Sequence, residues 1–312
     1  MKPHLHSLFR FNRPAVPTLR QGLDRYVDEI SPTKKCGIGN DRSLARMWQA
    51  TEYADWSMSK VSGPQVAAVR DAWLTRRKPS TVVRRLALLS HVYTTAQIEW
   101  GYRKLENPVK MIRKPKVRDA RERRLFPGVG IPGIDGNELD WILRETRSKY
   151  GPVAFQVAAK TAMRRGEVAS LDWKYVDFAA RTVHLPDTKN GHHRTVPLSP
   201  SALQVLRSVH VQGATGPVFP VSAGSLTRLF SRATRRARCR YEGLCQAHGI
   251  QPNPKLFTDL RLHDLRHEAI STMAPHFHAH ELAKISGHRD TRMLMRYYHP
   301  DPSELADRLA AI

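Results

Sequence analysis

A basic segment, residues 108–127, divides the chain into two parts with different patterns of hydrophobic residues. The segment reads PVKMIRKPKVRDARERRLFP and has no sustained apolar period, which is typical of a linker between domains. With 312 residues, the chain is long enough for two domains of ordinary size. We therefore predict a basic N-terminal arm at 1–16, a helical domain at 17–113, a basic linker at 114–124 and a second domain at 125–312.

Helical periodicity dominates the part before the linker. Apolar residues recur at helical spacing in residues 19–30 and again in residues 63–74. A third helix is predicted to begin with Ser80 as its N-cap and to continue through residues 81–100. Together these patterns predict a small all-helical bundle.

The part after the linker combines helices with a short hairpin. Residues 182–185 and 194–198 read as strands on either side of Asn190-Gly191, a strong signal for a tight hairpin turn. The predicted fold class is therefore mainly α with a small antiparallel β-sheet in the second domain. Helical patterns are found at 139–148, 153–171, 199–209, 225–238, 263–273, 282–286 and 291–298.

The chain carries a large excess of positive charge. It has 51 Lys and Arg against 28 Asp and Glu, a formal net charge of +23. Such a charge favours binding to the phosphate backbone of DNA or RNA, although ribosomes and anionic membranes would attract it too. The basic linker could follow a duplex while the two domains lie on its opposite faces, with plain disorder as the alternative. The candidate phosphate contacts are Arg76, Arg77, Lys78, Arg84, Arg113, Lys114 and Lys116.

No targeting signal, membrane span or metal site is expected. The first residues are basic without a long apolar run, and no stretch of about 18 apolar residues occurs, so we expect a soluble cytoplasmic protein. Cys36, Cys239 and Cys245 form no paired framework, which suits reduced thiols. Cys239, Cys245 and His248 lack the spacing of a zinc knuckle. Segment 239–262 has no assigned role beyond a loop that could touch DNA.

Five short motifs bring together side chains that an attack on a phosphodiester needs. In-line attack builds negative charge on the non-bridging oxygens, and guanidinium groups stabilise that charge without a metal. His263 and Arg266, three residues apart, would share one face of a helix. The motifs are TAMRRGE at 161–167, DTKNGHHRTVPL at 187–198, HDLRH at 263–267, SGHRD at 286–290 and MRYYHP at 295–300.

These motifs, in this order, resemble the phage integrase family of tyrosine recombinases over most of residues 150–300. The stretch STVVRRLALLSHVYTTAQIEWG at 80–101 resembles the core-binding domain of the same family. In detail, TKNGHHRTVPLS, HDLRHEAIS and ISGHR look closest to shufflon-type DNA invertases and related bacterial integrases. The implied fold is a helical core-binding domain followed by a mixed α/β catalytic domain of the DNA breaking-rejoining type.

The resemblance assigns the nucleophile to Tyr297. The family pattern places the tyrosine nine residues beyond the histidine of the Gly-His pair, His288, and a second histidine follows two residues later. Tyr297 with His299 fits this pattern, so Tyr298 is expected to pack against the helix below. A 3′-phosphotyrosine conserves the energy of the broken bond, and therefore no cofactor is expected.

Two arginines would hold the scissile phosphate in bidentate contacts, according to the same resemblance. They are Arg164, rather than its neighbour Arg165, and Arg266. Glu167 is expected to hold Arg164 in position without contacting the phosphate itself.

The remaining catalytic roles fall to a lysine and two histidines. The resemblance gives Lys189, on the hairpin, the role of protonating the departing 5′ oxygen. His263 and His288 would bond the phosphate, and His263 could also accept the tyrosine proton. His267 is expected to be a structural partner of His263, four residues before it.

The implied activity is site-specific recombination of double-stranded DNA by integration, excision or inversion. Four protomers would exchange strands through a four-way junction. Accessory DNA-bending proteins are possible further partners. A stripe of Leu305, Leu309 and Ile312 would dock on a neighbouring protomer or pack within its own chain. The alternatives are a type IB-like topoisomerase, which the tail stripe and the helical domain disfavour, and an inactive DNA-binding regulator, which the complete catalytic set disfavours.

Overall fold

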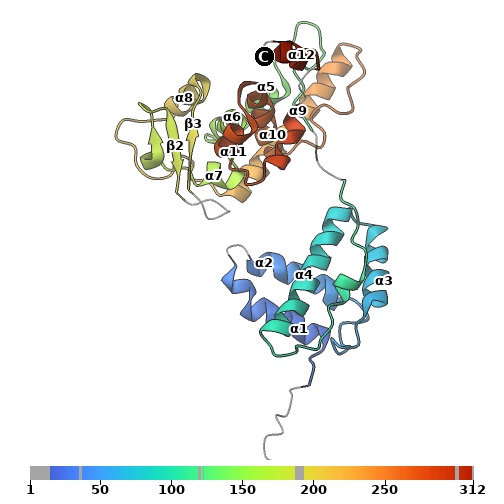
Figure 1. The fold of residues 1–312 in the computed structure, drawn as a ribbon. Coiled ribbons are helices and arrows are strands. Elements are labelled where there is room, and N and C mark those ends of the chain that lie inside the picture. Colours follow the sequence, from blue (N-terminus) through green and yellow to red (C-terminus); the bar gives the residue numbers. More distant parts are fainter. Residues whose placement is uncertain are drawn as a thin grey trace, which may run out of the picture. The chain divides into compact units, whose positions relative to one another are not determined.

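The computed structural model describes residues 15–34, 37–118, 121, 123–186, 193–298 and 302–310. The chain divides into two compact units, Met1–Arg121 and Glu122–Ile312, which Figure 1 shows as ribbons. This division falls inside the linker predicted at 114–124. None of the described helices is both long enough and apolar enough to cross a membrane.

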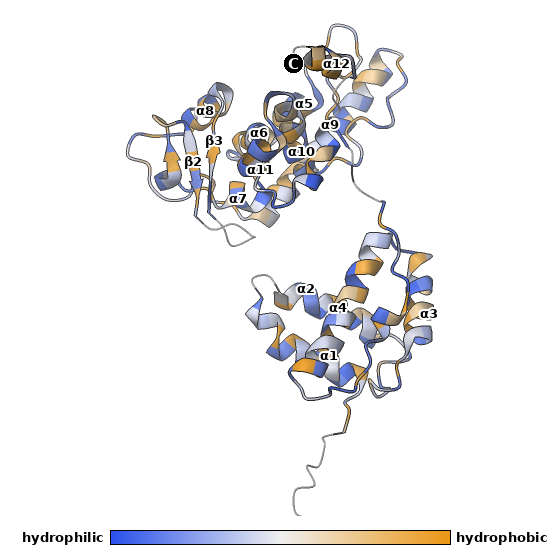
Figure 2. Cartoon of the chain, in the orientation of Figure 1, coloured by the Kyte–Doolittle hydropathy of each residue, from blue (hydrophilic) through white to orange (hydrophobic). Residues whose placement is uncertain are grey.

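Unit 1 is a helical bundle in its described residues. A capping box of Thr18 and Gln21 begins the first helix. Hydrophobic and hydrophilic residues alternate along the helices (Figure 2), and the apolar faces enclose the fully buried Tyr26, Trp48 and Tyr93. The elements are α1 (Leu19–Glu29), η1 (Ser31–Thr33), α2 (Gly37–Gln49), α3 (Gly63–Leu74), α4 (Pro79–Ile98) and η2 (Pro108–Met111).

Two features of unit 1 differ from the sequence prediction. Helix α2 was missed because glycines occupy its first turn, yet Ala45 and Trp48 lie on its buried face. Helix α4 has Lys78, not Ser80, at its N-cap, and Pro79 stands at the first helical position. Proline suits that position because its fixed φ is helical and its missing N–H would have no partner there.

Unit 2 combines helices with a three-stranded antiparallel sheet in its described residues, which confirms the predicted fold class (Figure 1). In the sheet order β1-β2-β3, Val183 of β2 pairs with Val196 of β3, and both are fully buried. The strands are β1 (Val176–Asp177), β2 (Thr182–Leu185) and β3 (Arg194–Pro197). The α-helices are α5 (Glu138–Arg144), α6 (Gly151–Thr161), α7 (Arg165–Ala169), α8 (Pro200–Arg207), α9 (Ala223–Ala247), α10 (Leu262–Met273), α11 (Ala279–Ser286) and α12 (Pro302–Ala310). The 3-10 turns are η3 (Trp173–Tyr175), η4 (Ala274–His276), η5 (Thr291–Met293) and η6 (Met295–Tyr297).

The helix predicted at 153–171 is two helices in the structure. Helix α6 ends at Thr161 because Ala162 adopts a left-handed backbone conformation with φ 54°, and Arg164 is the N-cap of α7. The apolar period runs through this break, so periodicity alone could not reveal it. The break frees the backbone carbonyl of Ala162 and places Arg164 at the start of a helix.

Helix α9 continues beyond the predicted range 225–238. Tyr241 and Cys245 extend the buried stripe of Ala237 in steps of four residues. Further along the chain, Leu256 and Phe257 are buried in the same core. Much of segment 239–262 therefore completes a helix and packs inside unit 2.

Residues 291–298 form the turns η5 and η6 instead of the predicted α-helix. The side chain of Asp290 accepts from the backbone N–H of Arg292 at the start, and the fully buried Leu294 separates the two turns. Leu294 packs with Ile270 of α10 and Leu282 of α11. This anchor brings the tyrosine of η6 back to α10.

Candidate active site

Helix α10 carries the polar residues of the HDLRH motif to one place. It packs against α6 and α11, and the residues at i, i+3 and i+4 share one side of it. Arg266 is 3% exposed, whereas His267 is half-buried and His263 is exposed. Nη1 of Arg266 donates to the carbonyl of Ala162, the group that the end of α6 leaves free. The break in the helix thus fixes this arginine.

Three arginines donate to three consecutive carbonyls at the end of α11. Carbonyls in the last turn of a helix have no partner within it and carry partial negative charge, so they attract cations. Gly287 ends the helix with φ 72°, and a Cβ there would lie 2.7 Å from Nη1 of Arg194, so only glycine allows this close approach. The pairs are Arg194 Nε with Ile285 (3.1 Å), Arg266 Nη2 with Ser286 (2.7 Å) and Arg164 Nη2 with Gly287 (2.6 Å).

The buried carboxylate of Glu167 joins two of these arginines. Arg194 donates to both oxygens, at 2.7 and 2.8 Å, and Arg164 donates from Nη1 at 2.9 Å and from its backbone N–H at 2.7 Å. Burial raises the pKa of Glu167, but the hydrogen bonds from Arg194 and Arg164 outweigh burial and leave that pKa lowered. With one carboxylate for three guanidinium groups, the cluster keeps the positive charge that suits a phosphate.

Arg194 was missed by the sequence analysis. It begins β3, and its side chain lies on the same face of the strand as that of the fully buried Val196. An arginine at an inward-facing strand position is the signal that could have identified it, because a buried cation requires partners.

The variant Glu167→Gln is expected to lose about 3 kcal/mol of unfolding free energy, because it leaves two guanidinium groups without their shared charge. DNA cleavage should fall about 100-fold as Arg164 loses its fixed position. Since folding lowers the pKa of Glu167, its stabilisation is present above the ordinary carboxyl pKa and is lost as the pH falls through the folded value. The stability difference should therefore shrink in acid.

Urea unfolding at several pH values measures the Glu167→Gln effect, and Glu242→Gln is the matched control. Glu242 forms an exposed i, i+4 pair with Arg238 on α9, and its loss should cost less than about 1 kcal/mol. Equal losses in the two variants would contradict the role given to Glu167.

His288 is held by Ser286, a residue that the sequence analysis did not single out. The Ser286 hydroxyl donates to the carbonyl of Leu282 at 2.6 Å and lies 2.7 Å from Nδ1 of His288. Because the hydroxyl has one hydrogen, it accepts from Nδ1–H, and Nε2 is left as an acceptor 3.4 Å from Arg266. Burial and Arg266 lower the pKa of His288 to about 4, so the ring is neutral at pH 7.

The hydroxyl of Tyr297 is within hydrogen-bonding distance of Nδ1 of His267. The rings stack, with centroids 6.1 Å apart and planes inclined by 30°. Burial raises the pKa of Tyr297, against the effect of Arg296 and Arg266, so the hydroxyl keeps its proton and donates it. Among the described residues, His263 makes no hydrogen bond to Tyr297, and its ring meets His267 edge-on with centroids 5.0 Å apart. From the i, i+4 spacing, the sequence analysis predicted the contact between His263 and His267 but not the contact between His267 and Tyr297.

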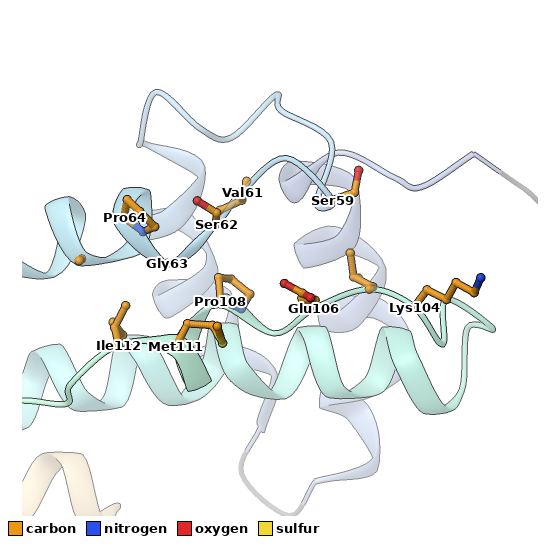
Figure 3. Close-up of a pocket in the computed structure, with 12 residues that line it drawn as sticks. Ser59, Val61, Ser62, Gly63, Pro64, Lys104, Glu106, Pro108, Met111 and Ile112 are labelled. Carbon is orange, nitrogen blue, oxygen red and sulfur yellow. The ribbon is translucent and has the colours of Figure 1, made fainter.

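A cavity of about 700 Å³ lies in unit 1, beside the start of α3 and η2 (Figure 3). Its lining is mixed, with the apolar Met111, Ile112 and Pro108 on one side and the polar Ser59, Ser62, Lys104 and Glu106 around it. No cluster of histidines or arginines converges on it. Among the described residues, the histidines and arginines expected to act on a phosphodiester gather around α10 and α11 instead.

The two described cysteines lie outside this cluster. Cys245 is buried in the core of unit 2 and Cys239 is exposed, while Cys36 falls outside the described residues. Within the described ranges, no group of three or more His, Cys, Asp and Glu side chains is arranged to hold a metal ion.

The sequence matches a known family over more than half of its length. The phage integrase family matches residues 134–304. Over 306 residues the chain is 34% identical to the shufflon-specific DNA recombinase of Escherichia coli, and the match covers 94% of this chain and 72% of that protein. The chain belongs to the phage integrase family. It is a tyrosine-type site-specific recombinase, which confirms the resemblance drawn from its motifs.

Solved integrases share the fold of this recombinase. The Tn1549 transposon integrase, in complex with a circular intermediate DNA, has a TM-score of 0.69 at 15% identity and covers 95% of this chain and 99% of that chain. A lambda integrase tetramer bound to a Holliday junction has a TM-score of 0.63 at 18% identity, with 92% and 83% covered. At these identities the likeness establishes the fold alone.

The structure of the recombinase brings most of the expected catalytic residues together, but not all of them can be placed. Lys189 and His299 lie outside the described residues. The seven basic residues expected to contact phosphates are all exposed. Gathered around α10 and α11 are Arg164, Glu167, His263, Arg266, His267, His288 and Tyr297.

Proposed function

We propose that this recombinase cleaves and rejoins DNA through a 3′-phosphodiester with Tyr297. The observation that carries the proposal is the cluster of three guanidinium groups fixed at the end of α11, beside α10, whose His267 contacts the tyrosine hydroxyl. An attacking oxygen and a preorganised set of cations are two of the groups that favour in-line displacement at phosphorus.

Each residue of the cluster has a proposed part in the reaction. Arg164 and Arg266 would bind the non-bridging oxygens of the scissile phosphate, and the exposed His263 would donate a further hydrogen bond. His288 would support Arg266, and it can donate to the phosphate only after gaining a proton at Nε2. Lys189 would protonate the departing 5′ oxygen. Because the phosphotyrosine conserves the bond energy, the proposed reaction consumes no ATP.

The proposed partners are double-stranded DNA with specific sites and other copies of the chain. The lambda integrase tetramer on a Holliday junction, which shares the fold, supports a tetramer as the active assembly. Leu305 and Leu309 of α12 are 41% and 71% exposed, and we propose that this stripe docks on a neighbouring protomer, together with Ile312, which lies outside the described residues. We also propose that accessory DNA-bending proteins assist the reaction. The proposed location is the cytoplasm, where such DNA lies.

Among the possible outcomes, inversion has the strongest support. The relative reported above at 34% identity is a shufflon-specific DNA recombinase. The test uses supercoiled plasmids that carry two candidate sites, taken from the DNA flanking the coding region, in inverted or direct orientation. Inversion or deletion of the intervening segment supports the proposal. Relaxation without rearrangement would indicate a topoisomerase, and retarded DNA without any strand cleavage would indicate an inactive regulator.

Removing basic side chains before α4 should reduce the salt dependence of DNA binding. Each lost phosphate contact lowers the slope of log K against log salt by about 0.9. The triple variant Arg76→Gln, Arg77→Gln, Lys78→Gln removes three exposed charges, and binding titrations from low to high salt measure the slope. The matched control, Arg103→Gln, Lys104→Gln, Lys110→Gln, removes three exposed charges elsewhere in unit 1. Equal slopes for the two variants would contradict the predicted contacts.

A further inference from the structure

We propose that His267 is the base that accepts the proton of Tyr297 when the tyrosine attacks the phosphate. The inference rests on the proposed function and adds a catalytic residue to it. It stands on a direct contact, since Nδ1 of His267 lies within hydrogen-bonding distance of the tyrosine hydroxyl. His263 contacts only the ring of His267 and has no hydrogen bond to that hydroxyl in the described residues.

The pair is in the protonation states from which this transfer starts. Partial burial and the neighbouring His263 lower the pKa of His267 to about 4, so the ring is neutral at pH 7. Burial raises the pKa of Tyr297, so the phenol is the donor and Nδ1 the acceptor. The neutral ring therefore carries its hydrogen on Nε2 and has Nδ1 free to take a second one. The ionisable groups around the pair are His263, Asp264, Arg266 and Glu268 of α10, together with Arg124, His288 and Arg296.

Three structural features hold the pair in place. The stacked rings restrict rotation of the tyrosine, and the buried Leu294 anchors the turn that carries it. Glu268, the next residue of α10, accepts hydrogen bonds from Nε and Nη2 of Arg124, at 2.8 and 2.9 Å. This ion pair joins the start of unit 2 to the helix that carries His267. The base and the nucleophile are thus preorganised before DNA binds.

The proton balance closes over both steps of recombination. During cleavage, the Oη–H bond of Tyr297 breaks, its proton passes to Nδ1 of His267, the Oη–P bond forms and the P–O5′ bond breaks. The departing 5′ oxygen takes its proton from the general acid, for which Lys189 is proposed. During ligation, a 5′-hydroxyl gives its proton to the general acid that cleavage left deprotonated, for which Lys189 is proposed, and the O5′–P bond forms. The P–Oη bond then breaks, and the imidazolium of His267 returns its proton to the leaving tyrosine oxygen. No electrons are transferred.

His267→Asn is the variant that separates proton transfer from positioning. The Asn side chain can place a hydrogen-bonding atom near the position of Nδ1 but cannot take the proton. Loss of a general base typically slows a reaction at least 100-fold, so we expect adduct formation at pH 7 to slow on the order of 100-fold. Above pH 7 the variant's rate should rise about tenfold per pH unit, as hydroxide replaces the base, while the wild type rises less. His263→Asn is the matched control and should lack this rescue by pH.

A duplex with sulfur in place of the scissile 5′ oxygen distinguishes the base from the acid, because a thiolate leaves without being protonated. On this phosphorothiolate, His267→Asn should stay slow, whereas Lys189→Ala should recover. Thermal unfolding and DNA binding of each variant, equal to those of the wild type, exclude a folding defect. Wild-type rates for His267→Asn at pH 7, or full recovery on the sulfur duplex, would overturn the inference and leave the proposed function intact. A wild-type enzyme that forms no adduct on any site would overturn both.

Discussion

Tyr297→Phe should abolish strand exchange and covalent attachment at every recombination site, while Tyr298→Phe retains both. The first change removes the only oxygen that the proposal allows to attack phosphorus, so no residual rate is expected above that of the uncatalysed reaction. Plasmid inversion and gel detection of denaturation-resistant protein–DNA adducts measure the two effects.

The adjacent tyrosine is a stringent control because it has the same chemistry in a different setting. The hydroxyl of Tyr298 donates to the backbone carbonyl of Phe277 at 2.8 Å, and its side chain packs against the hydrophobic cluster that contains Leu294 and Leu282. Losing this exposed hydrogen bond should cost about 1 kcal/mol of stability and little activity. Adducts that persist in Tyr297→Phe and vanish in Tyr298→Phe would reverse the assignment.

Arg266→Lys should slow cleavage about 1000-fold, although it preserves the positive charge. The guanidinium of Arg266 donates to the carbonyls of Ala162 and Ser286, and it lies 3.4 Å from Nε2 of His288. A lysine ammonium cannot satisfy both carbonyls and also present a planar fork to a phosphate. Removing one preorganised donor from a site of developing charge costs a factor of 100 to 1000 in many enzymes, hence our upper estimate of about 1000.

Because Arg266 is buried, its positive charge needs the negative charge of a bound phosphate. Desolvation and the charge of Arg164 lower the pKa of Arg266 to about 9, which still leaves it charged at neutral pH. Within the described residues no carboxylate lies close enough to form a salt bridge with it. A phosphate would supply the missing counter-charge, so the variant should also bind cleavage-site DNA less tightly.

Arg165→Lys is the control for the Arg266 prediction. Arg165 is exposed, and its Nη1 donates to the hydroxyl of Thr227 at 2.8 Å. Single-turnover cleavage of a nicked duplex gives the rates of both variants. A decrease of similar size in Arg165→Lys, or none in Arg266→Lys, would show that the wrong arginine was assigned.

Local sequence patterns correctly predicted the helices and strands that depend mainly on residues close together in the sequence. The strands at 182–185 and 194–198 and the helix at 63–74 follow from periodicity and turn residues, and the structure places them within one residue of those bounds. The motifs were likewise sufficient for the family, because they combine rare residue types at fixed spacing.

What the sequence could not reveal depends on contacts between distant segments. The break at Ala162 can be understood only from the structure. The carbonyl that it frees accepts a hydrogen bond from Arg266, which lies 104 residues later in the sequence. The roles of Arg194 and Ser286 depend on the end of α11, which periodicity does not bring near β3. His267 was predicted to support His263 because spacing shows neighbours on the same helix and not the tyrosine that returns to it from η6.

The most direct measurement is the identity of the residue that becomes attached to DNA. Purified wild-type protein is incubated, without metal or ATP, with nicked suicide duplexes that carry candidate sites from the flanking DNA. The adduct is then digested and its peptide is sequenced by mass spectrometry. We predict one modified peptide, with the 3′-phosphate of the DNA on the oxygen of Tyr297. An adduct on another residue, or tight and specific binding with no adduct on sites that recombine in cells, would contradict the proposed chemistry.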